Sequence, residues 1–77
     1  MSRVLHSPAY KKLRRLLVEA RTSAELTQGQ VADKMMRPQS FVSKYENGER
    51  HLDVIEFTEV CAAIGISPSQ VMQELAG

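Results

Sequence analysis

Residues 26–50, LTQGQVADKMMRPQSFVSKYENGER, predict two short helices joined by a tight turn. Thr27 can cap the first helix, because its side chain can accept a hydrogen bond from the backbone of Gln30 while Gln30 bonds back to Thr27. Pro38 has a fixed φ and turns the residue before it away from the helical conformation, so we expect the second helix to begin at about Pro38. Gly48 is typical of a left-handed helix end, and it closes the second helix.

One side of the second helix consists of hydrogen-bonding side chains with no acid among them. Its members share one helical face and are Gln39, Ser40, Ser43, Lys44 and Asn47. Gln can bridge N6 and N7 of adenine, Lys can reach O6 or N7 of guanine, and Ser can contact a base or a phosphate. We therefore predict that the first four of these residues read the base edges of DNA.

The same stretch resembles the helix-turn-helix of the Cro and phage-repressor (XRE) family of transcriptional regulators, and the resemblance extends without a gap from about Leu13 to Gly48. It rests on Gln28 opening one helix, Ala32 at the helix crossing, Gln39-Ser40 opening the next helix, and Glu46-Asn47-Gly48 closing it. Met36 departs from the family pattern, because it stands at the turn position where the family often has Gly. A non-Gly residue must then make the turn at some conformational cost.

The resemblance implies a compact, all-α, lambda-repressor-like DNA-binding domain of five helices, with the helix-turn-helix formed by the second and third. It also implies phosphate contacts by Thr27, Gln28, Arg37, Phe41, Asn47 and Arg50. The sequence itself supports the phosphate contacts at Thr27 and Gln28, because a helix N-terminus presents backbone N–H groups and the positive end of the helix dipole. Such contacts set register and salt dependence rather than sequence preference.

Arg21 is on the first predicted helix, in line with the apolar residues Leu17 and Ala24. A charge on such an apolar stripe needs a partner. Arg21 and Glu46 match the arginine and glutamate that pair between the first and third helices of the family. The resemblance therefore implies that they form a structural ion pair and that Glu46 does not contact DNA. The residues alone leave an alternative open, in which Arg21 extends past the apolar stripe into water.

The other three helices are predicted from the same local signals. Ser7-Pro8 begins the first helix, and its apolar stripe is formed by Leu13, Leu17, Ala20 and Ala24. Asp53 and Glu56 form a second capping box before the fourth helix, which Gly65 ends. The expected core residues of the fourth helix are Val54, Phe57, Val60, Cys61 and Ile64. Ser67-Pro68 begins the last helix.

The length of 77 residues predicts one domain, residues 1–77, with residues 1–6 as a flexible N-terminus. That length leaves no room for a separate ligand-binding or catalytic module, so we expect no small-molecule effector. No apolar run reaches membrane-spanning length, and the first residues, MSRVLHSP, lack the apolar segment of a secretion signal. We therefore expect a cytoplasmic protein that does not contact membranes.

The residue types that carry enzyme chemistry are not grouped in this sequence. It has no nucleophile–base pair, no cluster of carboxylates and no Gly-rich phosphate loop. His6 and His51 are isolated, without a second ligand at metal-binding spacing. Cys61 is a single cysteine in an apolar pattern, which predicts a small core residue. We therefore expect no enzyme activity, no metal site and no cofactor.

Charge is unevenly distributed along the chain, although the net charge is only +1. Residues 1–21 hold six basic residues and one acid, whereas residues 53–77 hold four acids and neither Lys nor Arg. The basic part could face DNA phosphates. A small chain can also show such asymmetry by chance.

The sequence favours a sequence-specific regulator of transcription that binds double-stranded DNA. A domain this small contacts few base pairs, so we expect a homodimer on a palindromic operator, with half-sites roughly 34 Å apart. The expected dimer surface is the last helix with the loop before it, through Ile66, Val71, Met72 and Leu75. Alternatively, these residues only close the core. A second functional hypothesis is a helical protein-interaction module, such as an antitoxin-type partner, in which DNA binding is secondary or absent.

Overall fold

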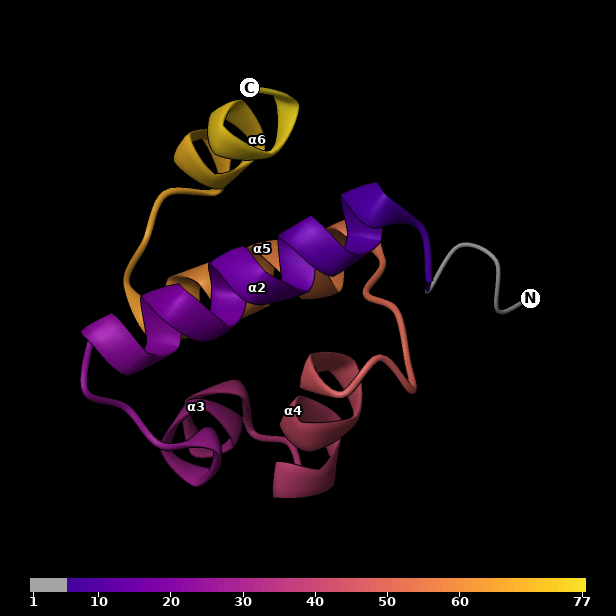
Figure 1. Ribbon diagram of the computed structural model, residues 1–77. Helices are drawn as coiled ribbons and strands as arrows, with labels where there is room; N and C mark the ends of the chain where they lie inside the picture. The colour runs from indigo at the N-terminus through magenta and orange to yellow at the C-terminus, as the bar shows by residue number, and fades with distance from the viewer. Residues whose placement is uncertain (1–5) are drawn as a thin grey trace.

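The computed structural model describes residues 6–77, and this part of the chain contains five helices and no strand (Figure 1). The helices are α2 (Pro8–Ser23), α3 (Gln28–Met35), α4 (Gln39–Glu46), α5 (Val54–Ile64) and α6 (Pro68–Ala76). The predicted all-α fold of five helices is therefore confirmed. The expected flexible segment 1–6 lies outside the described residues except for His6, which is in a turn.

The predicted helix starts are confirmed by their capping hydrogen bonds. The Ser7 side chain accepts from the backbone N–H of Tyr10 at 3.1 Å. Thr27 accepts from the N–H of Gln30 at 3.1 Å, and the Gln30 side chain accepts from the Thr27 N–H at 2.9 Å. These bonds satisfy helix-end donors that would otherwise lack a partner. Pro38 caps α4 by its backbone conformation alone, without a side-chain hydrogen bond.

The turn between α3 and α4 is made by Met36 in the left-handed conformation, with φ 57° and ψ 43°. The backbone N–H of Arg37 donates to the carbonyl of Ala32 at 3.0 Å, which closes the end of α3. A non-Gly residue in this conformation costs roughly 1–2 kcal/mol. The Met36 side chain is 92% exposed, so the cost is conformational and the side chain meets no crowding in the core.

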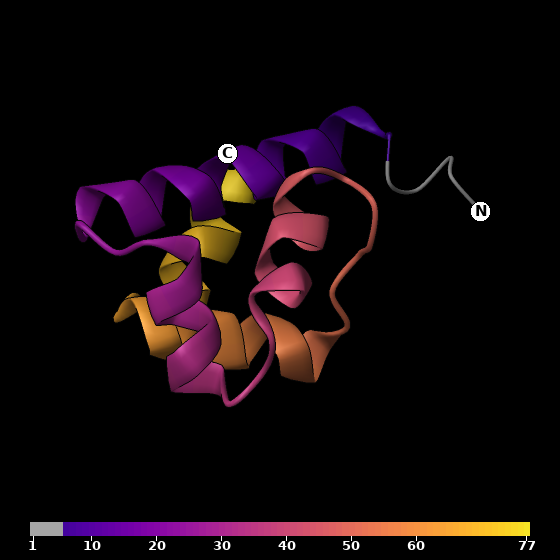
Figure 2. The ribbon, with the colours of Figure 1, turned by 90° about the horizontal axis from the view of Figure 1, so that it is seen from below.

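The helices share one core, and in Figure 1 α2 lies in front of α5, with α6 above them and α3 and α4 below. Seen from below, α3 and α4 lie next to each other and bridge α2 and α5 (Figure 2). The buried residues are Leu17, Val31, Ala32, Phe41, Val42, Tyr45, Phe57, Val60, Cys61, Ile64 and Val71. None of the helices in residues 6–77 is long and apolar enough to cross a membrane.

Two residues assigned to the core from the sequence lie on the surface. Val54 is 76% exposed because it is the first residue of α5, ahead of the first residue of that helix that reaches the core, Phe57. Ala24 is exposed because α2 ends at Ser23, which leaves Ala24 as the C-cap outside the packed stripe. The helical spacing was right in both cases, but the ends of the helices extend beyond the core.

Candidate nucleic-acid interface

The outer side of α4 presents the predicted base-reading residues, which we call the α4 stripe: Gln39, Ser40, Ser43 and Lys44. Gln39, Ser40 and Lys44 are exposed, and Ser43 is half-buried. The opposite side of α4 is fixed in the core, because Val42 and Tyr45 are 0% and 1% exposed. The helix therefore cannot rotate without exposing its apolar side, and its polar side stays directed outward.

The N-terminal turns of α3 and α4 meet beside the α4 stripe. A Cβ atom added at Gly29 would lie 3.6 Å from Oε1 of Gln39, so the Gln39 side chain runs close to the backbone of α3. Thr27 is exposed at the start of α3. The backbone at this helix N-terminus and the Gln39 amide thus belong to one polar surface, which is suited to an anionic partner.

Arg21 and Glu46 form an ion pair that connects α2 to the C-terminal end of α4. Arg21 donates through Nε to Glu46 Oε2 at 2.7 Å and through Nη2 to Oε1 at 3.0 Å. The two side chains are only 14% and 5% exposed. The hydrogen bond to Glu46 raises the pKa of Arg21 above its ordinary value. This bidentate geometry holds the C-terminal end of α4 against α2.

Gln28 also takes part in this ion-pair network. Its side-chain amide donates to Glu46 Oε1 at 2.8 Å, which links the first turn of α3 to α4. Gln28 was predicted to contact a phosphate, but its amide N–H is directed at Glu46. A phosphate contact at Gln28 would use the second N–H of its side-chain amide or its backbone N–H at the helix N-terminus.

A second charged cluster lies on the flank of α4 and is formed by Arg37, Phe41, Arg50 and Glu56; we call it the arginine cluster. The guanidinium carbons of Arg37 and Arg50 lie 4.5 Å and 4.6 Å from the centroid of the Phe41 ring. Arg50 donates through Nη1 and Nη2 to the two oxygens of Glu56 at 2.9 Å and 2.8 Å. Arg37 reaches the same carboxylate at 3.8 Å. Both arginines are thus held by an aromatic ring and a carboxylate.

Phe41, which was predicted to contact phosphate, has little of its side chain open to such a contact. Its side chain is only 6% exposed, and its ring packs edge-on against Tyr45 at a centroid distance of 5.7 Å. Phe41 is a core residue whose ring supports two guanidinium groups. Asn47, which was also predicted to bind phosphate, is exposed at the C-terminal end of α4.

Glu56 has a pKa lowered to about 2, chiefly because its carboxylate accepts hydrogen bonds from Arg50. Since its pKa in the folded state lies below the ordinary value of 4.5, Glu56 contributes stability that is fully present above pH 4.5. That stability is lost as the pH falls toward about 2.

We therefore expect the free energy of unfolding, measured by urea denaturation, to fall as the pH is lowered from 4.5 to 2. Glu56→Gln should show a smaller decline over the same range, because glutamine cannot be protonated. If the two proteins lose stability in parallel, the Glu56 carboxylate is not coupled to folding in this way.

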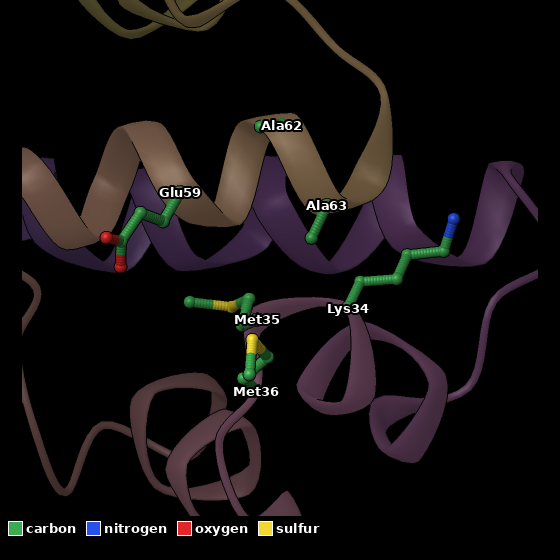
Figure 3. Close-up of a pocket in the computed structure, with 6 residues that line it drawn as sticks. All are labelled: Lys34, Met35, Met36, Glu59, Ala62 and Ala63. Atoms are coloured by element: carbon green, nitrogen blue, oxygen red, sulfur yellow. The ribbon is translucent and has the colours of Figure 1, made fainter.

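A shallow pocket of about 350 Å³ lies behind the turn, between the end of α3 and α5. Figure 3 shows Met35 and Met36 below α5, with Glu59 on one side and Lys34 on the other. The remaining lining residues are Ala62 and Ala63.

In residues 6–77, no group of three or more His, Cys, Asp or Glu side chains could hold a metal ion. Cys61 is buried, and burial raises the pKa of its thiol to about 11.

A family model described as Helix-turn-helix matches residues 17–71. Among solved structures, an XRE-family like protein from Pseudomonas syringae pv. tomato str. DC3000 is 47% identical to this chain, with a TM-score of 0.90. The match covers 96% of this chain and 90% of that one. The chain belongs to the XRE family of helix-turn-helix proteins.

Two more distant structures resemble this XRE-family protein in fold. The clp gene regulator ClgR from C. glutamicum is 24% identical, with 94% of each chain covered and a TM-score of 0.81. A point mutant of the restriction-modification controller protein C.Esp1396I is 20% identical, with 91% of this chain and 89% of that chain covered and a TM-score of 0.82. No curated protein sequence matches the XRE-family chain.

The local pattern of the XRE-family chain did not reveal two features of its interface. The sequence predicts a DNA contact for Gln28 but not its bond to Glu46, because these two residues are 18 positions apart in the sequence. Glu56 was recognised only as part of the capping box of α5, although it also binds Arg50. The available signal was an acid at the start of α5 that follows Arg50 by 6 residues, which is compatible with an ion pair across the loop.

Proposed function

We propose that this XRE-family protein is a sequence-specific transcription regulator that binds double-stranded DNA with α4 in the major groove. The observation that carries the proposal is the α4 stripe: its uncharged and basic hydrogen-bonding side chains lie on one side of a helix whose other side is fixed in the core. An α-helix fits the major groove of B-DNA, where each base pair presents a distinct pattern of donors and acceptors. Gln39 and Lys44 are the side chains with the reach for base edges.

Phosphates would be contacted on both sides of the α4 stripe. On one side, the N-terminus of α3 at Thr27 and Gln28 offers backbone N–H groups. On the other side, Asn47 is exposed, and Arg37 and Arg50 are 35% and 37% exposed. These contacts carry no sequence information, but they fix the register of α4 in the groove.

Titration of labelled duplexes tests this function against a pure protein-interaction role. We expect binding to random-sequence DNA at low salt. The slope of the logarithm of the binding constant against the logarithm of the salt concentration should correspond to several phosphate contacts. We expect tighter binding to a preferred sequence. A protein-interaction module would bind neither duplex at low salt.

We further propose that a second copy of the chain binds at an apolar surface where α5 begins and α6 packs, which we call the dimer patch: Val54, Ile55 and Met72. Val54, Ile55 and Met72 are 76%, 66% and 41% exposed, and Val54 and Met72 line one groove of about 370 Å³. Exposed apolar side chains that gather in one place mark interaction sites. The sequence predicted a dimer surface on the last helix and the loop before it; of its residues, Met72 is in the dimer patch, whereas Val71 is only 6% exposed and closes the core.

Ile55→Asp is expected to shift the protein from dimer to monomer at tens of micromolar without lowering its thermal stability. A charge in an apolar interface is costly to desolvate, whereas an acid in the first turn of a helix is favourable. Ala9→Asp is the matched control, because Ala9 is also the exposed second residue of a helix. Sedimentation equilibrium measures both variants. A dimer that persists in Ile55→Asp excludes this surface.

A further inference from the structure

Arg37 and Arg50 flank α4 in the sequence, and their guanidinium groups lie on the same side of this helix. Arg37 precedes the helix in the turn, and Arg50 follows its C-terminal end, yet both guanidinium groups lie over the ring of Phe41. Their side chains are 35% and 37% exposed, so each is open to solvent on one side. Arg37 and Arg50 are therefore partly exposed cations that precede and follow α4 and that rest on the buried ring of Phe41.

Glu56 already binds two N–H donors that Arg50 would offer to a phosphate, and it lies within ion-pair distance of Arg37. It binds Arg50 with both carboxylate oxygens, and it lies 3.8 Å from Nη1 of Arg37. A carboxylate and a phosphate present the same pair of oxygens to a guanidinium fork. A DNA phosphate at this flank would thus compete with Glu56 for the same N–H groups.

The position of Glu56 is fixed independently of the arginines. Its side chain accepts from the backbone N–H of Asp53 at 3.1 Å, and its own N–H donates to the Asp53 carboxylate at 2.7 Å. Its side chain is 12% exposed, whereas that of Glu59, the other acid that reaches Arg37, is 48% exposed. The capping box of α5 therefore holds the Glu56 carboxylate in place beside the flank of α4.

We propose that Glu56 is an internal competitor for the DNA backbone, which limits sequence-independent binding by holding Arg37 and Arg50. This inference rests on the proposed function, since it matters only if the chain binds DNA. Backbone contacts contribute equally to all sequences, whereas the α4 stripe distinguishes between them. Because Glu56 restrains the two arginines, the protein binds less tightly to DNA whose bases do not match the α4 stripe.

The direct test is Glu56→Gln on a random-sequence duplex. Glutamine keeps an oxygen that can accept from the Asp53 N–H but removes the charge that competes with phosphate. We expect affinity at about 0.1 M salt to rise roughly three- to tenfold, with the log–log salt slope steeper by about 1. Glu59→Gln is the matched control for net charge, because Glu59 is on the same helix and contacts Arg37 at 3.6 Å; its effect should be smaller.

A mutant cycle with Arg50→Gln shows whether the gain acts through the arginine cluster. Arg50→Gln alone should weaken binding to random DNA, and adding Glu56→Gln to it should give less gain than in the wild-type background. An unchanged or reduced affinity in folded Glu56→Gln, or an equal gain in both backgrounds, overturns the proposal.

A measurement on the wild-type protein does not depend on any variant folding. Because phosphate replaces Glu56, the guanidinium NMR signals of Arg37 and Arg50 should shift when random duplex is added to saturation. Signals that stay in place at saturation overturn the competition. Absence of any DNA binding by wild type at low salt refutes the proposed function itself, and the inference with it.

Discussion

Glu46→Ala is expected to lower the free energy of unfolding by about 3 kcal/mol. The change leaves the Arg21 guanidinium, which is 14% exposed, with the Leu26 carbonyl at 2.9 Å as its remaining hydrogen-bond partner. It also removes the acceptor of the Gln28 amide. Breaking one partner of a buried pair costs much more than the pair contributes net, because the remaining charge stays desolvated.

Urea denaturation followed by circular dichroism measures this effect. Glu19→Ala is the matched control, because Glu19 pairs with Arg15 at 3.8 Å on the surface, where the two side chains are 59% and 62% exposed. A surface pair of this kind contributes about 0.5 kcal/mol or less. If Glu46→Ala costs no more than Glu19→Ala, the network does not hold α4 as we describe.

Gln39→Ala is expected to reduce affinity for the preferred DNA sequence by about 1–3 kcal/mol and to relax the preference at one base position. Gln39 is exposed and lies in the first turn of α4, so the change should leave folding stability nearly intact. Its effect should be smaller on random DNA, where the bidentate contact with adenine is not made.

Competitive titration with the preferred duplex and a random duplex separates these two effects. Gln73→Ala is the matched control, because Gln73 is an exposed glutamine on α6, away from the α4 stripe. Arg50→Ala should weaken both duplexes alike, since a phosphate contact does not read sequence. Equal losses on both duplexes for Gln39→Ala would remove its base-reading role.

The helix starts and the turn could be predicted because their causes are local. The capping boxes at Thr27 and Asp53 involve residues three apart, and both are present. Met36 was expected to make the turn at some conformational cost, and it does so in the left-handed conformation. Signals of this kind depend only on neighbouring residues in the chain.

The sequence did not predict the surroundings of residues that contact distant parts of the chain. Phe41 is on α4 with the α4 stripe, but Arg37 from the turn before the helix and Arg50 from the loop after it lie over its ring. Val54 has the helical spacing of a core residue, yet the N-terminal end of α5 extends beyond the core. The partners of Gln28 and Glu56 lie on other segments, so spacing along the sequence could not identify them.

Selection of bound sequences from a random pool of duplex DNA by the wild-type protein tests the role of the α4 stripe most directly. We expect enrichment of a palindrome whose half-sites are about one helical turn apart, which is the separation that a symmetric dimer imposes. Repeating the selection with Gln39→Ala should relax one position in each half-site. A bound fraction with the same sequence distribution as the starting pool would contradict base reading by α4.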